Sequence, residues 1–130
     1  MSANGRYGVL LVDDVAALRT LLRLSLELSG RFKILAEAEN GLQGVELAGE
    51  HQPDLVLLDI SMPLQDGLES LPRIRSASPR SKIVMLSGFE ERRLGSTALG
   101  LGASAYLEKG LPPERIVDEL LDVMGASVSP

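Results

Sequence analysis

Residues 55–67 read LVLLDISMPLQDG, and this stretch decides the fold class. Four consecutive apolar residues, Leu55 to Leu58, are typical of a strand covered on both faces, because a strand with one wet face alternates apolar and polar residues. The run stops at Asp59, and Asp66 is well placed to cap a following helix. A buried strand followed by a helix predicts a parallel α/β unit.

The same unit recurs along the chain without an internal repeat of sequence. Five apolar runs are short enough to be strands: Val9 to Val12, Phe32 to Ala38, Leu55 to Leu58, Ile83 to Leu86 and Ala103 to Leu107. Each is followed by a stretch with helical periodicity, which predicts five helices that cover both faces of one sheet. The chain is therefore expected to form a single-domain, doubly wound α/β fold.

The helix boundaries carry their own signals. Asn40 is expected to cap the second helix, which would run to about Gly49, and the third would run from Asp66 to about Ala77. Pro112 or Pro113 suits the first turn of the last helix. The fourth, within 88–100, is the weakest, because each of its interior glycines costs about 1 kcal/mol relative to alanine.

The strand patterns also indicate strand positions. The runs 32–38 and 103–107 alternate apolar and polar residues, which is typical of edge strands, whereas the other three are continuous. With the first, third and fourth strands inside, the order 2-1-3-4-5 is allowed. That order places a topological switch point between strands one and three, where open α/β sheets bind their ligands.

Composition excludes several classes of protein. The chain has 130 residues, suitable for one domain, and a net charge of −5, which argues against direct nucleic-acid binding by this domain. It has no cysteine, so disulfides, thiol nucleophiles and thiolate metal sites are excluded. No apolar run approaches the ~18 residues of a membrane span, and no membrane association is expected. A cytoplasmic location is the default expectation.

Polar residues stand where the predicted strands end. Asp13 and Asp14 follow the first strand, Asp59 the third, Ser87 the fourth and Lys109 the fifth. These ends share one rim of a parallel sheet, and three carboxylates gathered there would repel one another unless a hard divalent cation such as Mg²⁺ relieved them. With a lysine and a hydroxyl beside it, Asp59 is a candidate nucleophile for a phosphoryl group.

These motifs resemble the response-regulator receiver domain of bacterial two-component signalling, a chemotaxis-regulator-like and flavodoxin-like fold. The matching segments are LLVDD at 10–14, LVLLDISMPLQDG at 55–67, MLSG at 85–88 and AYLEKG at 105–110. The resemblance implies that Asp59 accepts a phosphoryl group from a histidine kinase, a phosphotransfer protein or a small acyl phosphate. The implied function is a phosphorylation-activated switch that is not a turnover enzyme.

Further roles follow from the resemblance alone. Asp14, Asp59 and the Ser61 carbonyl would hold Mg²⁺, and Asp13 would act through a bound water. Ser87 would hydrogen-bond a phosphoryl oxygen and Lys109 would pair with its charge.

The same resemblance implies an output mechanism. Ser87 and Tyr106 would form the switch that repacks segment 88–100 and alters the surface of helix four, strand five and helix five. That surface would contact an output domain or downstream protein, and phosphorylation could promote a homodimer.

One departure concerns the residue after Lys109. Many receivers have proline there, whereas Gly110 is similar to receivers that precede a helix-turn-helix DNA-binding domain. We expect residues 1–5 to form a tail, 6–125 the receiver domain and 126–130 a tail or the start of a linker. Either the chain is a single-domain regulator or it is the receiver part of a longer transcriptional regulator; the small-polar end favours the second slightly.

Two other functions stay open. A phosphohydrolase with an aspartyl-phosphate intermediate would share the nucleophile and the metal, although such enzymes typically place an acid where Ser61 stands. A phosphate-independent interaction module of the same shape is the other. Taken singly, Asp14 could cap a helix, Ser87 could belong to a turn and Lys109 could be a solvated surface residue, so the functional interpretation depends on all of them meeting.

Overall fold

The computed structural model describes residues 5–60, 62, 65–88 and 95–126. Its elements alternate strictly between strand and helix. The strands are β1 (Tyr7–Val12), β2 (Phe32–Ala38), β3 (Leu55–Asp59), β4 (Lys82–Ser87) and β5 (Ala105–Glu108). The helices are α1 (Ala16–Leu28), α2 (Gly41–His51), α3 (Gly67–Ala77), α4 (Gly95–Gly100) and α5 (Pro113–Val123).

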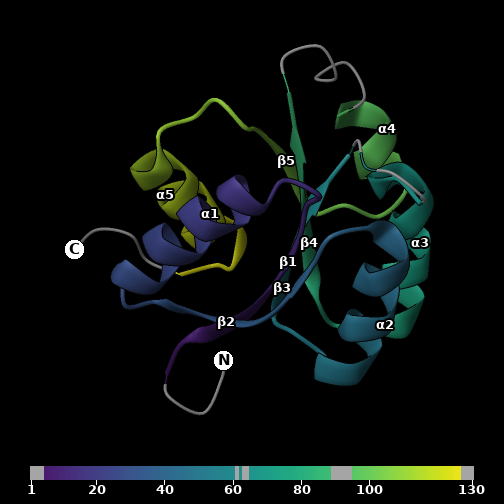
Figure 1. Ribbon diagram of the computed structural model, residues 1–130, viewed down its shortest axis with the longest axis horizontal. Coiled ribbons are helices and arrows are strands. Elements are labelled where there is room, and N and C mark those ends of the chain that lie inside the picture. The colour runs from purple at the N-terminus through teal and green to yellow at the C-terminus, as the bar shows by residue number, and fades with distance from the viewer. Residues whose placement is uncertain (1–4, 61, 63–64, 89–94, 127–130) are drawn as a thin grey trace.

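The five strands form one parallel sheet in the order β2-β1-β3-β4-β5. The predicted fold class is thereby confirmed, including the edge positions of β2 and β5. In Figure 1 the sheet is seen nearly edge-on, with α1 and α5 on one face and α2, α3 and α4 on the other. The switch point lies between β1 and β3, as expected from the strand order.

The predicted helix starts are also confirmed. The Asn40 side chain accepts a hydrogen bond from Gln43 N at the start of α2. Asp66 and Glu69 form a reciprocal capping box at the start of α3, which satisfies backbone N–H groups that have no partner within the helix. Pro113 begins α5, where its missing N–H costs nothing.

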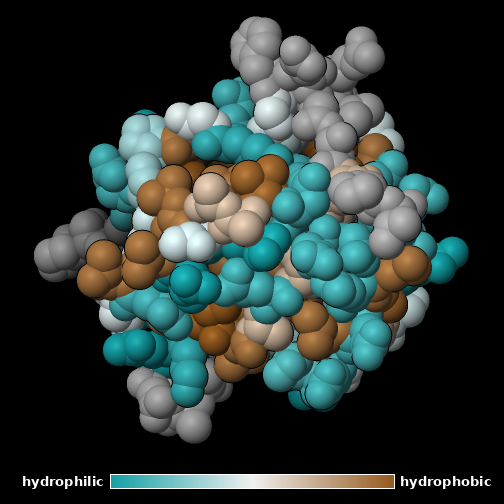
Figure 2. Space-filling model, viewed as in Figure 1, coloured by the Kyte–Doolittle hydropathy of each residue, from teal (hydrophilic) through white to brown (hydrophobic). Residues whose placement is uncertain are grey.

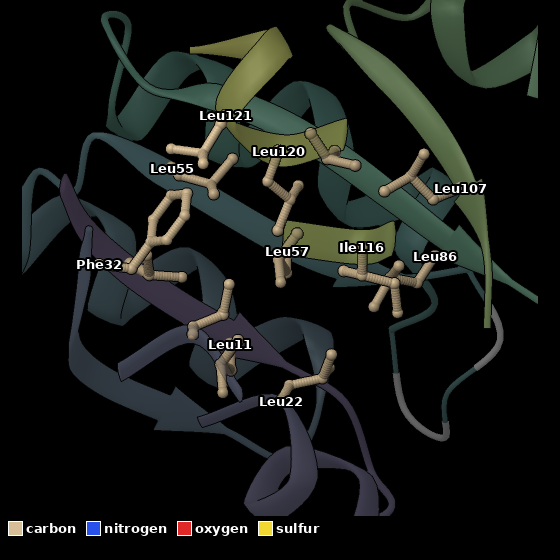
Figure 3. Close-up of a cluster of buried hydrophobic side chains, with 13 residues drawn as sticks. Leu11, Leu22, Phe32, Leu55, Leu57, Leu86, Leu107, Ile116, Leu120 and Leu121 are labelled. Carbon is tan, nitrogen blue, oxygen red and sulfur yellow. The ribbon is translucent and has the colours of Figure 1, made fainter. Parts of the chain in front are cut away.

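The sheet divides the interior into two apolar clusters. One lies against α1 and α5 and contains Leu11, Leu22, Phe32, Leu57 and Leu120 among others (Figure 3). The other lies against α2, α3 and α4 on the opposite face. Because both faces of β1, β3 and β4 are covered, these strands are buried over almost their whole length, which accounts for their continuous apolar sequences.

Strand β2 contains an irregularity that its alternating sequence does not reveal. The pairing with β1 runs from Val9 opposite Ile34 directly to Leu10 opposite Ala36, so one residue of β2 is skipped. Before this bulge the apolar side chains join the α1 and α5 cluster, and after it they join the other cluster. The bulge therefore places Glu37 on the α1 side of the sheet, because successive side chains alternate between faces.

Two boundaries differ from the sequence expectation. Strand β5 begins at Ala105 rather than at residue 103, since Ser104 and Ile83 exchange hydrogen bonds through the serine hydroxyl as well as the backbone. The segment 88–100 contains the short helix α4 over its last residues. Residues 89–94, which belong to the predicted repacking segment, lie outside the described part of the chain.

The described surface carries an apolar ridge along α1. Leu21 and Leu24 are about half exposed and Leu28 is 85% exposed, and Figure 2 shows apolar surface over this helix. Among the described helices, none has the length and apolar character needed to cross a membrane.

Candidate functional site

The predicted site residues meet at one end of the sheet. Asp59 is the last residue of β3 and Ser87 the last of β4, and their side chains are 1% and 0% exposed. Both strands are central, so each terminal side chain is surrounded by neighbouring strands and the helices beyond them. Parallel strands end at the same rim, which is why residues distant in sequence converge here.

Asp13 is held at this rim by the loop between β1 and α1. Its N–H donates to Ala38 O at 3.0 Å, and its Oδ1 accepts from Val15 N at 2.9 Å. The helix cap position is Val15, without a capping side chain, so Asp14 does not cap α1. Asp14 is exposed instead and faces water at the edge of the site.

Lys109 joins the acids from the end of β5. Its Nζ lies 2.9 Å from Asp59 Oδ1 and 3.6 Å from Asp13 Oδ2, with the lysine side chain 26% exposed. The Lys109 N–H donates to Ser87 O at 2.9 Å, which ties the lysine backbone to β4. The side chain is thus not a solvated surface lysine, and its charge is directed at two buried carboxylates.

The three aspartates have the geometry of a hard-cation site. Carboxylate oxygens of Asp13, Asp14 and Asp59, one from each, all lie within 4.8 Å of one another. Oxygen-only donors with one side open to water suit Mg²⁺, which keeps several water ligands. The donor set therefore fits the ion, although the predicted Ser61 ligand lies outside the described residues.

Ser87 and Tyr106 occupy neighbouring strands with different surroundings. The Ser87 hydroxyl is buried and makes no hydrogen bond to any residue of the described ranges. A buried hydroxyl without a partner is costly, which indicates a place for an additional acceptor beside it. Tyr106 is half-buried and packs on the α2, α3 and α4 side, opposite Met85 in the register of β4 and β5.

Burial raises the pKa of the Asp13 carboxyl above its usual value of 3.8. The hydrogen bond from Val15 N–H and the charge of Lys109 oppose this rise, and the nearby Asp14 adds to it. A pKa that is higher in the folded state than in the unfolded state means that the charged carboxylate destabilises the fold at pH values above the unfolded-state pKa.

Replacing Asp13 with asparagine should stabilise the protein in the absence of divalent cations, by about 1 kcal/mol, a common size for one substitution. The amide keeps the acceptor for Val15 N–H and removes the buried charge. Chemical unfolding near neutral pH measures the change, and the advantage should shrink toward pH 4 as wild-type Asp13 gains its proton. A variant less stable than wild type at neutral pH would contradict the interpretation.

Two contacts at the site were not apparent from sequence. Gly67 N donates to Ile60 O at 2.7 Å, and a Cβ at Gly67 would lie 2.1 Å from Asp59 O, so α3 begins in close contact with the end of β3. Arg19 Nη1 on α1 donates to Asp13 O at 2.5 Å. The glycine could have been noticed as the G of LVLLDISMPLQDG, whereas no signal singles out Arg19 among thirteen Lys and Arg residues.

Comparison with known proteins decides the family. The family model for the response regulator receiver domain matches residues 9–121. The chain belongs to this family. Receiver domains of response regulators are signalling domains and generally not catalytic enzymes, and they interact with histidine kinases and output domains.

Two relatives of this receiver domain differ in how much of their length it matches. Chemotaxis protein CheY of Halobacterium salinarum is 38% identical over 118 residues, 91% of this chain and 97% of the relative. Nitrate/nitrite response regulator protein NarL of Escherichia coli K12 is 39% identical over 120 residues, 92% of this chain and 56% of the relative. The chain thus spans nearly all of the first relative and about half the length of the second.

A solved structure supports the same assignment. The signal receiver domain of the putative response regulator NarL from Mycobacterium tuberculosis has a TM-score of 0.86 and 30% identity. The match covers 94% of this chain and 98% of that one.

Proposed function

We propose that this receiver domain accepts a phosphoryl group on Asp59 in the presence of Mg²⁺ and thereby changes the surface that it presents to an output partner. The observation that carries the proposal is the position of Lys109 Nζ, 2.9 Å from Asp59 Oδ1, beside two further acids suited to a cation. A buried acid with only a structural role would need no more than one counter-charge. Asp59 is surrounded by a cationic side chain, a candidate cation site and a buried hydroxyl that has no hydrogen-bond partner among the described residues.

Each side chain has a distinct part in the proposed transfer. An Asp59 carboxylate oxygen attacks the phosphorus, forming an acyl phosphate as the bond to the leaving imidazole nitrogen or acyl oxygen breaks. Lys109 is placed to stabilise the negative charge on the transferring group, and the Ser87 hydroxyl is available to donate to one of its oxygens. Mg²⁺ held by Asp14 and Asp59, with Asp13 through water, would neutralise further charge on that group.

A relative supports the metal and the phosphoryl site. A CheY from Borrelia burgdorferi, 28% identical with a TM-score of 0.83, has been solved in complex with CheX, BeF₃ and Mg²⁺. The match covers 90% of this chain and 88% of that one. Beryllium trifluoride resembles a phosphoryl group in shape and charge, so a ligand of this class with Mg²⁺ is what the acids, lysine and serine of the present rim suit.

The proposed switch runs from Ser87 to Tyr106. Phosphorylation converts the Asp59 carboxylate into a group of about −2 charge with added acceptor oxygens. A hydrogen bond from Ser87 to one of them would draw the end of β4 inward and shift the half-buried Tyr106. The surface of α4, β5 and α5 would then change by a population shift between two arrangements.

We further propose a histidine kinase or phosphotransfer protein as donor. The likeness to both CheY and NarL leaves two classes of output, a separate protein or a DNA-binding domain in the same polypeptide. Phosphorylation-dependent dimerisation belongs to the same proposal. We propose the same domain bounds as the sequence suggests, with residues 1–5 as a tail, 6–125 as the receiver domain and 126–130 as a tail or the start of a linker.

Intact-mass measurement after incubation with acetyl phosphate tests the proposal. With Mg²⁺ present, the chain should gain the mass of one phosphoryl group, and a chelator should reduce the gain at least tenfold, because the metal neutralises charge on the transferring group. Absence of any gain with Mg²⁺ would overturn the proposal.

The same samples distinguish the open alternatives. Sustained turnover of an added phosphate monoester would favour a phosphohydrolase. A partner that binds the phosphorylated and unphosphorylated chain equally well would favour a phosphate-independent interaction module.

A further inference from the structure

Arg19 contacts the acidic site through a hydrogen bond to a backbone carbonyl. Its Nη1 donates to Asp13 O at 2.5 Å, and this carbonyl belongs to the peptide that joins Asp13 to Asp14. The direction of that peptide plane sets where the exposed Asp14 side chain leaves the backbone. Fixing the carbonyl therefore restricts the directions from which the Asp14 carboxylate can approach the other two acids.

The orientation of Arg19 is itself fixed by Glu37. Arg19 Nε lies 3.0 Å from Glu37 Oε1, so the planar guanidinium spans the carboxylate of β2 and the carbonyl of the loop. The side chains of Arg19 and Glu37 are 16% and 24% exposed, so the pair is better shielded from water than a surface pair.

The β2 bulge makes this arrangement possible. Without the skipped residue, Glu37 would fall on the α2 side of the sheet, away from α1. With it, Glu37 lies on the same face as Leu11, opposite it in register, and meets Arg19 and Arg23 on α1.

We infer that Arg19, held by Glu37, is a positioning residue that sets the Asp13–Asp14 loop for Mg²⁺ binding. This inference rests on the proposed function for the metal itself. It adds that Mg²⁺ affinity depends on a side chain that is not a ligand and whose positive charge opposes cation binding.

Arg23 is a matched control within the same cluster. It also forms an ion pair with Glu37 from α1, but within the described residues its side chain makes no hydrogen bond to the loop between β1 and α1. Arg19→Met and Arg23→Met each remove one positive charge and one ion pair to the same carboxylate. Loss of charge alone should strengthen Mg²⁺ binding in both variants, whereas loss of positioning should weaken it only in Arg19→Met.

The experiment measures the Mg²⁺ dissociation constant by titrating MgCl₂ into isotope-labelled protein and following the backbone amide shifts of Asp14 and Val15. Arg19→Met should bind Mg²⁺ about tenfold more weakly than Arg23→Met, the lower range for losing support around a metal site. Arg23→Met should bind as tightly as wild type or more tightly. Saturating Mg²⁺ should restore the phosphorylation rate of Arg19→Met with acetyl phosphate.

Each other outcome is decisive. Equal dissociation constants for Arg19→Met and Arg23→Met, with Mg²⁺ binding intact in wild type, would overturn the inference and leave the proposed function standing. Wild type that does not bind Mg²⁺ would overturn both. If Arg19→Met does not fold, Arg19→Lys replaces it in the experiment. Lysine keeps the positive charge but lacks the planar guanidinium, so this variant should still bind Mg²⁺ more weakly than wild type. Wild-type affinity in Arg19→Lys would refute the inference.

Discussion

Replacing Asp59 with asparagine is expected to abolish phosphoryl uptake from acetyl phosphate. Asparagine has nearly the same shape but its amide is not a nucleophile, so no acyl phosphate can form. Uptake should fall below detection, since the covalent step itself is lost. Intact-mass measurement in the presence of Mg²⁺ reports the result.

The control for this variant is Asp118→Asn, which removes one exposed acid from α5 and gives the same change in net charge. It should be phosphorylated as fast as wild type. Labelling of Asp59→Asn at the wild-type level would place the phosphoryl group on another residue. A thermal melt of both variants separates loss of the acceptor from loss of the fold.

A single added methyl group at Gly67 is expected to destabilise the protein severely. The Cβ of Gly67→Ala would lie 2.1 Å from Asp59 O and 2.8 Å from the Cα of Ile60. Both are backbone atoms, so no side-chain rotation can relieve the clash. The start of α3 or the end of β3 must then move. We expect a loss of about 2 kcal/mol or more in the free energy of unfolding, within the range for overpacking, measured by urea denaturation.

The same displacement should slow phosphorylation in any Gly67→Ala molecule that remains folded, because Asp59 is the residue that is pushed. Gly49→Ala provides the comparison, since its nearest contact would be an ordinary 3.7 Å to Ala77 Cβ. That change should be neutral or stabilise by up to about 1 kcal/mol through helix propensity. Equal stability of the two variants would show that the structure accommodates the close contact at Gly67 at little cost in free energy.

The sequence was sufficient for the fold because its signals agreed with one another. Continuous apolar runs marked the buried strands, alternation marked β2 and β5 as edges, and Asn40 and Asp66 proved to be the helix caps. The bulge was invisible, because the alternating residues of 32–38 look the same whether or not one of them is skipped. Small residues such as Ala36 and Ala38 fit either face.

For the candidate site, the sequence predicted those residues that stand at the ends of parallel strands. Asp13, Asp14, Asp59, Ser87 and Lys109 meet at the rim as predicted. Their chemical roles remain predictions that the proposed experiments test. Arg19 could not be foreseen, because its contact with Asp13 O depends on tertiary packing of α1 against β2 rather than on any local pattern.

The separation of the interior into two clusters by the sheet has a consequence for adaptation. Tyr106 packs on the α2, α3 and α4 side, whereas residues such as Leu22 and Leu120 lie on the other. Under the proposed switch, substitutions of α1 residues such as Leu22, which lie outside the changing surface of α4, β5 and α5, are expected to change the energy of both signalling states alike. Heat tolerance can therefore evolve on one side of the sheet while the strength of the resting signal is tuned on the other.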